Sequence, residues 1–269
     1  MVKKLIKWDF ASYLRLLLPV QLILLGIAAL NRFIQLFEDS SSSAYEIVFG
    51  SSVFLYVVSV IVAIVLTFVV SIVRFYQGMY TNEGYLTHTL PVTPAQHIFS
   101  KLIVTMLFYL GTFFAIFLSF IILTLGELNI EIFKAFGYMF GKLTEYSRGH
   151  FIMYFIELIL LILGSLITST LSIYFCISIG QLAQKRKILL AFGAYFGLYF
   201  IKQVLGTIII IIFTLLGRSV WDVIGQWVSY NIFAFYHFVL IGALVVELVM
   251  AVIYFLLTRF IMKKKLNLT

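Results

Sequence analysis

Long apolar stretches alternate with short polar connections along the chain, from Leu14 to Phe260. An α-helix rises 1.5 Å per residue and needs about 20 apolar residues to cross a hydrocarbon core of roughly 30 Å. Six stretches reach or exceed that length. The pattern therefore predicts six membrane-spanning helices, over residues 14–36, 49–73, 102–126, 151–180, 188–216 and 236–260.

The composition agrees with this pattern. Hydrophobic residues make up 63% of the 269 residues and charged residues only 11%, whereas soluble domains carry about 25% charged residues. We therefore expect an all-α, polytopic membrane protein with a single transmembrane domain over residues 1–269. Cys176 is the only cysteine, which excludes an intrachain disulfide and a metal cluster built from thiolates.

Charged residues are distributed unevenly between the two ends of the predicted spans. An even number of spans places both termini on one side, which then collects 13 basic and 2 acidic residues, against 5 basic and 7 acidic residues on the other side. Because basic loops face the cytoplasm, we predict cytoplasmic termini and a multi-pass cell-membrane protein, in a bacterial plasma membrane. The net charge of +8 does not indicate a nucleic-acid partner, because the basic residues lie at helix ends and not on one continuous face.

Three segments outside the spans are predicted to lie at the membrane surface. Residues 3–13 fit an N-terminal helix on the inner surface, and a charged flank of the first span explains them equally well. On the outer side, residues 127–150 and 217–235 are predicted to form short helices at the headgroup level, or, for the second, to dip into the membrane before the last span.

The longest cytoplasmic connection, residues 74–101, contains Pro91 and Pro94. Proline cannot continue the interior of a helix but is favoured at the first helical position. We therefore predict a helical piece that ends near Pro91, a sharp turn, and a second helix that Thr93-Pro94 opens.

Three short motifs in this connection carry a resemblance to a known family. They are Glu83-Gly84-Tyr85-Leu86, then Thr89-Leu90-Pro91-Val92-Thr93, and finally Ser100-Lys101 before a new span. In this order they resemble the cytoplasmic loop of ABC-2-type transporter permeases, the membrane subunits of bacterial ABC exporters with the type V fold. The predicted six spans with both termini inside are similar to that family as well.

The resemblance implies a role for this connection. The segment around Gly84 to Thr93 would be a coupling helix that docks on a separate nucleotide-binding ATPase subunit, with Glu83 steadying the loop. The residues concerned are Glu83, Gly84, Tyr85, Leu86, Leu90, Pro91, Val92, Thr93 and Lys101. The resemblance also implies a second permease subunit, identical or paralogous.

The sequence contains no G-x-x-x-x-G-K-[ST] motif, whose backbone amides cradle phosphates. We therefore expect ATP and Mg²⁺ on the partner ATPase, and a non-catalytic transmembrane subunit that binds no cofactor itself. The four histidines (His88, His97, His150 and His237) are scattered without metal-ligand spacing, so no metal site is predicted.

Three charged residues lie inside the predicted spans and away from their ends, Glu157, Lys202 and Glu247. A charge at the bilayer centre costs at least about 2.5–3.5 kcal/mol, so each is expected to face protein or water. Lys202 and Glu247 lie at similar depth and are predicted to form an ion pair, which fixes two spans or lines a path for substrate or protons. Gly193 and Gly197 form a G-x-x-x-G that permits close packing, within the chain or between two permease subunits.

Taken together, these features predict the permease subunit of an ATP-binding-cassette exporter that moves an amphiphilic substrate, namely an antimicrobial peptide, a drug or a lipid. Export of antimicrobial peptides, or resistance to them, is one such activity. Two alternatives stay open: an ion-coupled secondary transporter or channel that uses the intramembrane charges, and a membrane anchor or regulator of an ATPase. An ATPase subunit that copurifies with the chain would separate the first alternative from the exporter.

Overall fold

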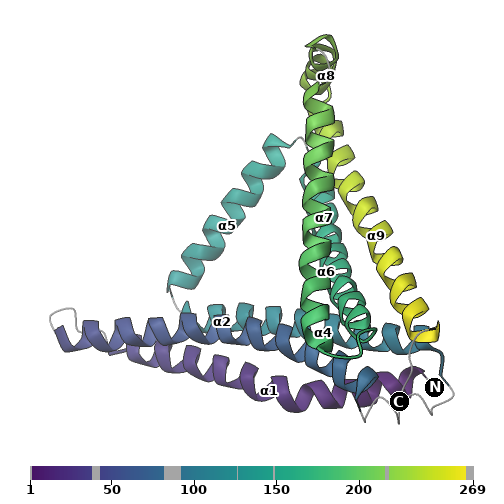
Figure 1. Cartoon of the computed structure of the whole chain (residues 1–269). Helices are drawn as coiled ribbons and strands as arrows, with labels where there is room; N and C mark the ends of the chain where they lie inside the picture. The colour runs from purple at the N-terminus through teal and green to yellow at the C-terminus, as the bar shows by residue number, and fades with distance from the viewer. Residues whose placement is uncertain are drawn as a thin grey trace. The chain divides into compact units, whose positions relative to one another are not determined.

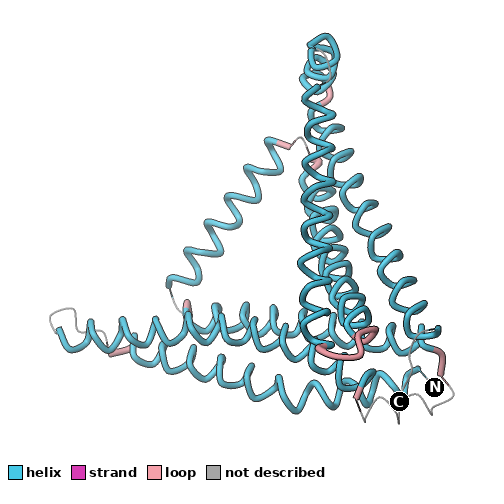
Figure 2. The backbone as a smooth tube through the Cα atoms, viewed as in Figure 1, coloured by secondary structure: helices cyan, strands magenta, loops and turns pink. Residues whose placement is uncertain are grey.

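The computed structural model describes residues 2–37, 43–81, 92–125, 127–147, 149–215 and 218–264. All regular elements within these ranges are α-helices (Figure 1 and Figure 2). In chain order they are α1 (Val2–Gln35), α2 (Ser43–Tyr80), α4 (Pro94–Leu123), α5 (Glu127–Tyr146), α6 (Phe151–Gly180), α7 (Lys187–Leu215), α8 (Arg218–Tyr230) and α9 (Ile232–Lys264). The chain divides into two compact units, Met1–Phe140 and Gly141–Thr269.

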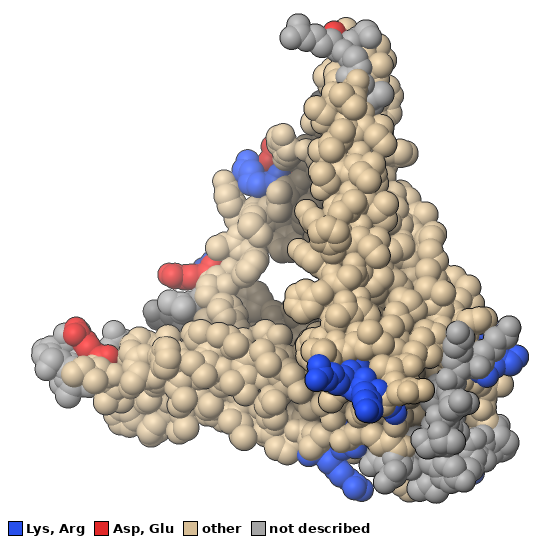
Figure 3. Space-filling model, viewed as in Figure 1, with Lys and Arg blue, Asp and Glu red and all other residues tan. Residues whose placement is uncertain are grey.

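Six of the helices, α1, α2, α4, α6, α7 and α9, are long and apolar enough to cross a membrane. They coincide with the six predicted spans to within a few residues at most ends, which confirms the all-helical fold and supports the prediction of a multi-pass membrane protein. Large apolar side chains such as Phe113 and Phe196 are 70% and 68% exposed. On the face drawn in Figure 3, most of the surface is neither basic nor acidic, as contact with hydrocarbon requires.

Several helices extend beyond the predicted spans at one or both ends, among them α1, α2, α4 and α9. Residues 3–13 and the first span form the single helix α1, and the position of residues 3–13 at the membrane surface stays a prediction. α2 continues to Tyr80, seven residues beyond the predicted end at residue 73. A charged or polar residue does not end a helix once the helix leaves the apolar layer, so hydrophobicity alone places such ends too early.

In the first unit, α1 packs along α4 and α2 through one buried stripe of its surface (Figure 1). The stripe consists of Tyr13, Leu17, Leu24, Ala28 and Asn31, at helical spacings of three, four and seven residues. Pro19 lies inside α1.

Hydroxyl groups join α2 to α4 in the same unit. Thr67 Oγ1 lies 2.9 Å from Thr112 Oγ1, and Tyr56 Oη lies 2.9 Å from Ser119 Oγ. Such polar bonds between helices take the place of a hydrophobic driving force in lipid.

In the second unit, α6 packs along α9, and α7 packs against α6. Tyr174 and Cys176 on α6 and Tyr254 on α9 are buried in this packing, with the rings of Phe175 and Tyr254 stacked at 5.9 Å. α5 and α8 are helices that fall in the segments 127–150 and 217–235. The packing of α6 along α9 is therefore the main helix–helix interface of this unit.

Candidate functional site

The start of α4 is fixed by a complete capping box. Thr93 is the N-cap: its Oγ1 accepts from the N–H of Gln96 (3.4 Å), and the Gln96 side chain accepts from the Thr93 N–H (2.9 Å). Pro94 occupies the first helical turn, where its missing N–H costs nothing. The sequence prediction that Thr93-Pro94 opens a helix is therefore confirmed.

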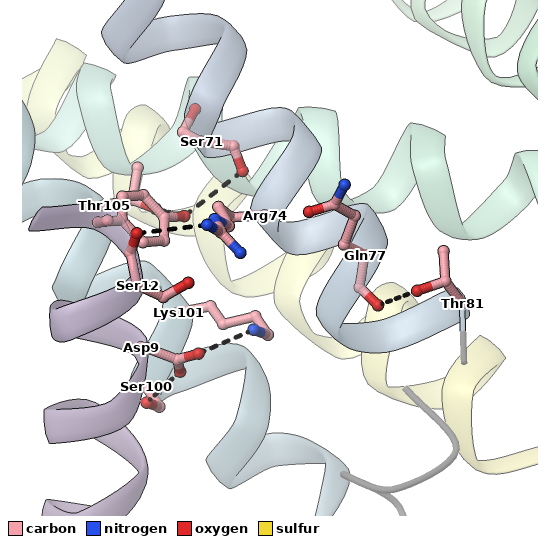
Figure 4. A network of polar contacts seen from close by, with 10 residues as sticks. Asp9, Ser12, Ser71, Arg74, Gln77, Thr81, Ser100, Lys101 and Thr105 are labelled. Carbon is pink, nitrogen blue, oxygen red and sulfur yellow. Dashed lines mark hydrogen bonds and ion pairs between the residues drawn. The ribbon is translucent and has the colours of Figure 1, made fainter. Parts of the chain in front are cut away.

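Two turns further along α4, Lys101 forms a buried ion pair with Asp9 of α1 (Figure 4). Its Nζ donates to Asp9 Oδ1 at 3.0 Å, and Ser100 Oγ donates to Asp9 Oδ2 at 2.9 Å. The two charged side chains are only 6% and 16% exposed. Both carboxylate oxygens of Asp9 thus have a donor, which a buried charge requires.

The end of α2 joins the same cluster. Arg74 Nη2 donates to the backbone carbonyl of Ser12 at 3.4 Å (Figure 4). Gly78 makes the room that Lys101 needs, because a Cβ built on Gly78 would lie 2.5 Å from Lys101 Nζ. Thus α1, α2 and α4 meet around one lysine.

A second layer of polar contacts lies against this cluster. Tyr13 Oη lies 3.0 Å from Thr105 Oγ1 and 3.5 Å from the carbonyl of Ser71, and Ser71 Oγ lies 3.0 Å from Tyr109 Oη. Tyr13 also packs with Leu17, Val104 and Phe108 in a buried apolar cluster. These contacts hold the three helices in one register, and we call the set Asp9, Arg74, Gly78, Ser100 and Lys101 the clamp.

The clamp lies where the connection between α2 and α4 leaves and rejoins the helices. Of the predicted coupling residues, Lys101 is in the clamp, while Val92 and Thr93 lead directly into α4. Glu83, Gly84, Tyr85, Leu86, Leu90 and Pro91 lie outside the described residues. Sequence reasoning missed Asp9 as the partner of Lys101, although Asp9 is one of only two acidic residues on the predicted cytoplasmic side.

The second unit contains a membrane-level cavity of about 330 Å³ between α6, α7 and α9. Its lining is Ser165, Leu166, Thr168, Ser169, Ser172, Tyr195, Leu198, Tyr199, Lys202 and Glu247. Lys202 and Glu247 therefore lie beside the same cavity.

The predicted ion pair between Lys202 and Glu247 is wrong for this structure. Both residues are described, and no contact of 4.0 Å or less joins their charged groups among the salt bridges of the described residues. Lys202 Nζ instead lies over the ring of Tyr254, 5.3 Å from its centroid. Equal depth brings two residues to one level of the membrane but does not turn their side chains toward each other.

The third intramembrane charge, Glu157, has a partner that the sequence analysis did not identify. Glu157 Oε1 lies 2.7 Å from His237 Nδ1, and His237 Nε2 lies 3.3 Å from His150 Nδ1. Tyr154 packs on His237 with ring centroids 4.3 Å apart. His237 lies at the start of the last predicted span and Glu157 near the start of the fourth, so the sequence places both toward the same side of the membrane but does not pair them.

The glycines that allow close packing in the second unit are not the predicted pair. A Cβ at Gly193 or Gly197 would have nothing within 4 Å. At Gly164 it would meet Leu244 of α9 at 3.2 Å, and at Gly180 it would meet the carbonyl oxygen of Lys187 at 2.6 Å. Close packing within the chain, one of the two interpretations of Gly193 and Gly197, is therefore not observed.

Within the described ranges no group of three His, Cys, Asp or Glu side chains is arranged to hold a metal ion. Comparison with known proteins gives no match, whether to a family model, to a curated protein or to a solved structure.

Proposed function

We propose that this chain is the permease subunit of an ATP-driven exporter, and that the connection between α2 and α4 receives movement from a separate ATPase subunit. The observation that carries the proposal is the clamp. Its buried Asp9–Lys101 pair, with the Gly78 and Arg74 contacts, joins α1, α2 and α4 next to both ends of that connection. A force on the connection would therefore act on three spanning helices together.

The charge distribution supports the same proposal. The side with 13 basic and 2 acidic residues includes the ends of α2 and α4 that flank the connection, and basic loops face the cytoplasm. An ATPase in the cytoplasm would reach the connection there. The resemblance of residues 83–101 to the ABC-2-type loop points to the same contact.

In the proposed cycle, ATP binding and hydrolysis on the partner would shift the clamp helices between two arrangements and so change which side of the membrane the substrate path faces. Coupling between distant sites requires such a two-state element. The substrate would be amphiphilic: an antimicrobial peptide, a drug or a lipid. A second permease subunit, identical or paralogous, would complete the path, and the open α7 surface at Gly193 and Gly197 is available to it.

Copurification tests the proposal. We would express the tagged chain together with the ATPase genes that neighbour it in the genome and measure the ATPase that is retained and the substrate export of the cells. Glu83→Ala, Pro91→Ala and Lys101→Met are expected to lower export by about fivefold or more, the size of an ordinary coupling energy. The matched control is Lys142→Met, which breaks an exposed ion pair with Glu145. Retention of full export in all three variants would overturn the proposed role of the connection.

An ion-coupled transporter is the second candidate, because the His150–His237–Glu157 chain and the charges of Lys202 and Glu247, which form no ion pair among the described residues, place titratable groups inside one unit. The chain alone, reconstituted in vesicles, would then move protons or solute along an imposed pH gradient. We expect no such flux. A gradient-driven flux that His237→Gln abolishes would favour the second candidate over the exporter.

A further inference from the structure

The cavity between α6, α7 and α9 contains two opposite charges that do not neutralise each other. From this we infer that it binds the polar end of a zwitterionic amphiphile, with the anionic group of the ligand at Lys202 and its cationic group at Glu247. The inference concerns this unit by itself and does not depend on an ATPase partner.

Both charges lie deep in their helices. Lys202 is 15 residues from the start of α7 at Lys187, and Glu247 is 15 residues from the start of α9 at Ile232. At 1.5 Å per residue each lies about 22 Å along its helix. Each therefore carries the cost of a charge within the hydrocarbon layer unless a partner compensates it.

The protein itself supplies little of that compensation. Among the described residues, no hydrogen bond or ion pair reaches the Lys202 ammonium or the Glu247 carboxylate. The Tyr254 ring, whose centroid lies 5.3 Å from the Lys202 ammonium, gives Lys202 a cation–π contact. Thr168 bonds only the backbone carbonyl of Glu247, at 2.9 Å. Two unsatisfied charges of opposite sign call for a ligand that carries both.

The α7 wall of the cavity offers hydrogen-bond donors. Tyr195, Tyr199 and Lys202 follow one another at spacings of four and three residues, which places them on one helix face. No hydrogen bond of either tyrosine hydroxyl is present among the described residues, so both can donate. Two hydroxyls and an ammonium on one face suit a phosphate or a carboxylate.

The α6 wall has the opposite character. Ser165, Ser169 and Ser172, again at spacings of four and three, each donate their own proton to a carbonyl one turn earlier, at 2.7–3.0 Å. Their oxygens are therefore left as acceptors, and the Glu247 carboxylate adds a negative charge. This side suits an ammonium group. Donors and acceptors on separate walls fit the two ends of a zwitterion better than a singly charged ligand.

The size of the cavity limits what it holds. About 330 Å³ is at the lower end of the range for small-molecule sites, so it can take a headgroup but not a folded peptide. Leu166 and Leu198 complete the lining and can contact the first carbons of an attached chain. A phospholipid headgroup and the free polar end of an amphiphilic solute share this chemistry.

Binding to the purified full chain in maltoside detergent tests the inference, with isothermal titration of four probes. Lysophosphatidylethanolamine and Nε-lauroyl-lysine are zwitterions, lysophosphatidylglycerol is an anion, and dodecylamine is a cation. We expect both zwitterions to bind at least about tenfold more tightly than the singly charged probes. Each singly charged probe lacks one of the two charged groups and so leaves either Lys202 or Glu247 without a partner. If only lysophosphatidylethanolamine binds tightly, the ligand is a lipid headgroup; if only lauroyl-lysine does, it is a free amphiphile.

Charge variants separate recognition from folding. Lys202→Glu and Glu247→Lys are each expected to weaken zwitterion binding by about tenfold, and the double exchange to restore most of it, because it returns one charge of each sign to the cavity. Lys187→Met, on the same helix but outside the cavity, is the matched control and should leave the affinity unchanged. Equal affinity of all four probes, or failure of a well-folded double exchange to bind better than the single variants, would overturn the inference.

Discussion

Among the described residues of the first unit, Asp9 and Lys101 form the one buried ion pair, so removal of either charge leaves the other charge buried without its partner. Removal of one partner of a buried ion pair lowers the free energy of unfolding more than removal of both. The remaining charge still has its desolvation cost but has lost the attraction to its partner. Lys101 is 6% exposed and Asp9 16% exposed, so little water can replace the missing partner. The effect should be measurable as a difference between single and double variants.

We expect Asp9→Asn and Lys101→Met each to lower the free energy of unfolding by about 3–5 kcal/mol. The double variant should be clearly less destabilised than the sum of the two. Thermal unfolding in detergent, followed by fluorescence, measures all three. Lys142→Met is the control, and it should change stability by less than about 1 kcal/mol, since the Lys142–Glu145 pair is exposed. Additive single effects would show that the two residues do not interact.

For single residues, the sequence identifies which side chains matter better than it identifies the side chains that they contact. Lys101 was found because a local motif marks it, and Thr93 because capping is a local interaction. Asp9 lies 92 residues away from Lys101, and no rule of spacing links the two. Lys202 and Glu247 show the same limit, because the sequence predicts that both lie inside spans, while the direction of each side chain depends on how α6, α7 and α9 pack.

Among the elements of the second unit, α6 has two glycines that allow a neighbour to approach closely. Gly164 lets Leu244 of α9 approach, and Gly180 lets the chain turn back so that the start of α7 packs on it. Neither position belongs to a G-x-x-x-G pair, and a Cβ at Gly193 or Gly197, the pair predicted to allow close packing, would meet no atom of the described chain within 4 Å. A motif for close approach therefore marks a possible interface but does not say which helix fills it.

Gly180→Ala is expected to destabilise the second unit by about 1–3 kcal/mol, the usual cost of overpacking. The added methyl would lie 2.6 Å from the Lys187 carbonyl oxygen and 2.7 Å from Ala191 Cβ, and backbone cannot move aside cheaply. Gly193→Ala is the matched control and should be neutral or stabilising by up to about 1 kcal/mol, from helix propensity alone. Midpoints of thermal unfolding compare the two. A decrease in thermal stability from Gly193→Ala as large as that from Gly180→Ala would contradict the close contact inferred at Gly180.

The six spans themselves follow from the sequence because each is a continuous apolar run of sufficient length, and no tertiary contact is needed to recognise one. Their ends do not. α2 runs on through Arg74 to Tyr80, and these added turns carry Gly78 and Arg74 of the clamp. The part of the helix that hydrophobicity fails to predict is thus the part that meets Lys101.

For the whole molecule, the charge distribution predicts an orientation that a single experiment can check. Cys176 is the only cysteine and is buried, so Cys176→Ser gives a background without thiols. A cysteine at position 142 should react with a membrane-impermeant maleimide in intact cells, and a cysteine at position 185 only after lysis, because basic connections stay in the cytoplasm. The reverse pattern would place the connection between α2 and α4 outside and remove any ATPase from its reach.

Pro19 gives α1 an uneven stiffness along its length. Proline has no N–H, so the Arg15 carbonyl lacks its usual donor one turn later, and the helix can bend there at little cost. Asp9 lies ten residues before this weak point and Asn31 twelve residues after it. A displacement of the Asp9 end of α1 would therefore change the bend at Pro19 and tilt the half of the helix beyond it. It would not translate the whole helix along its axis.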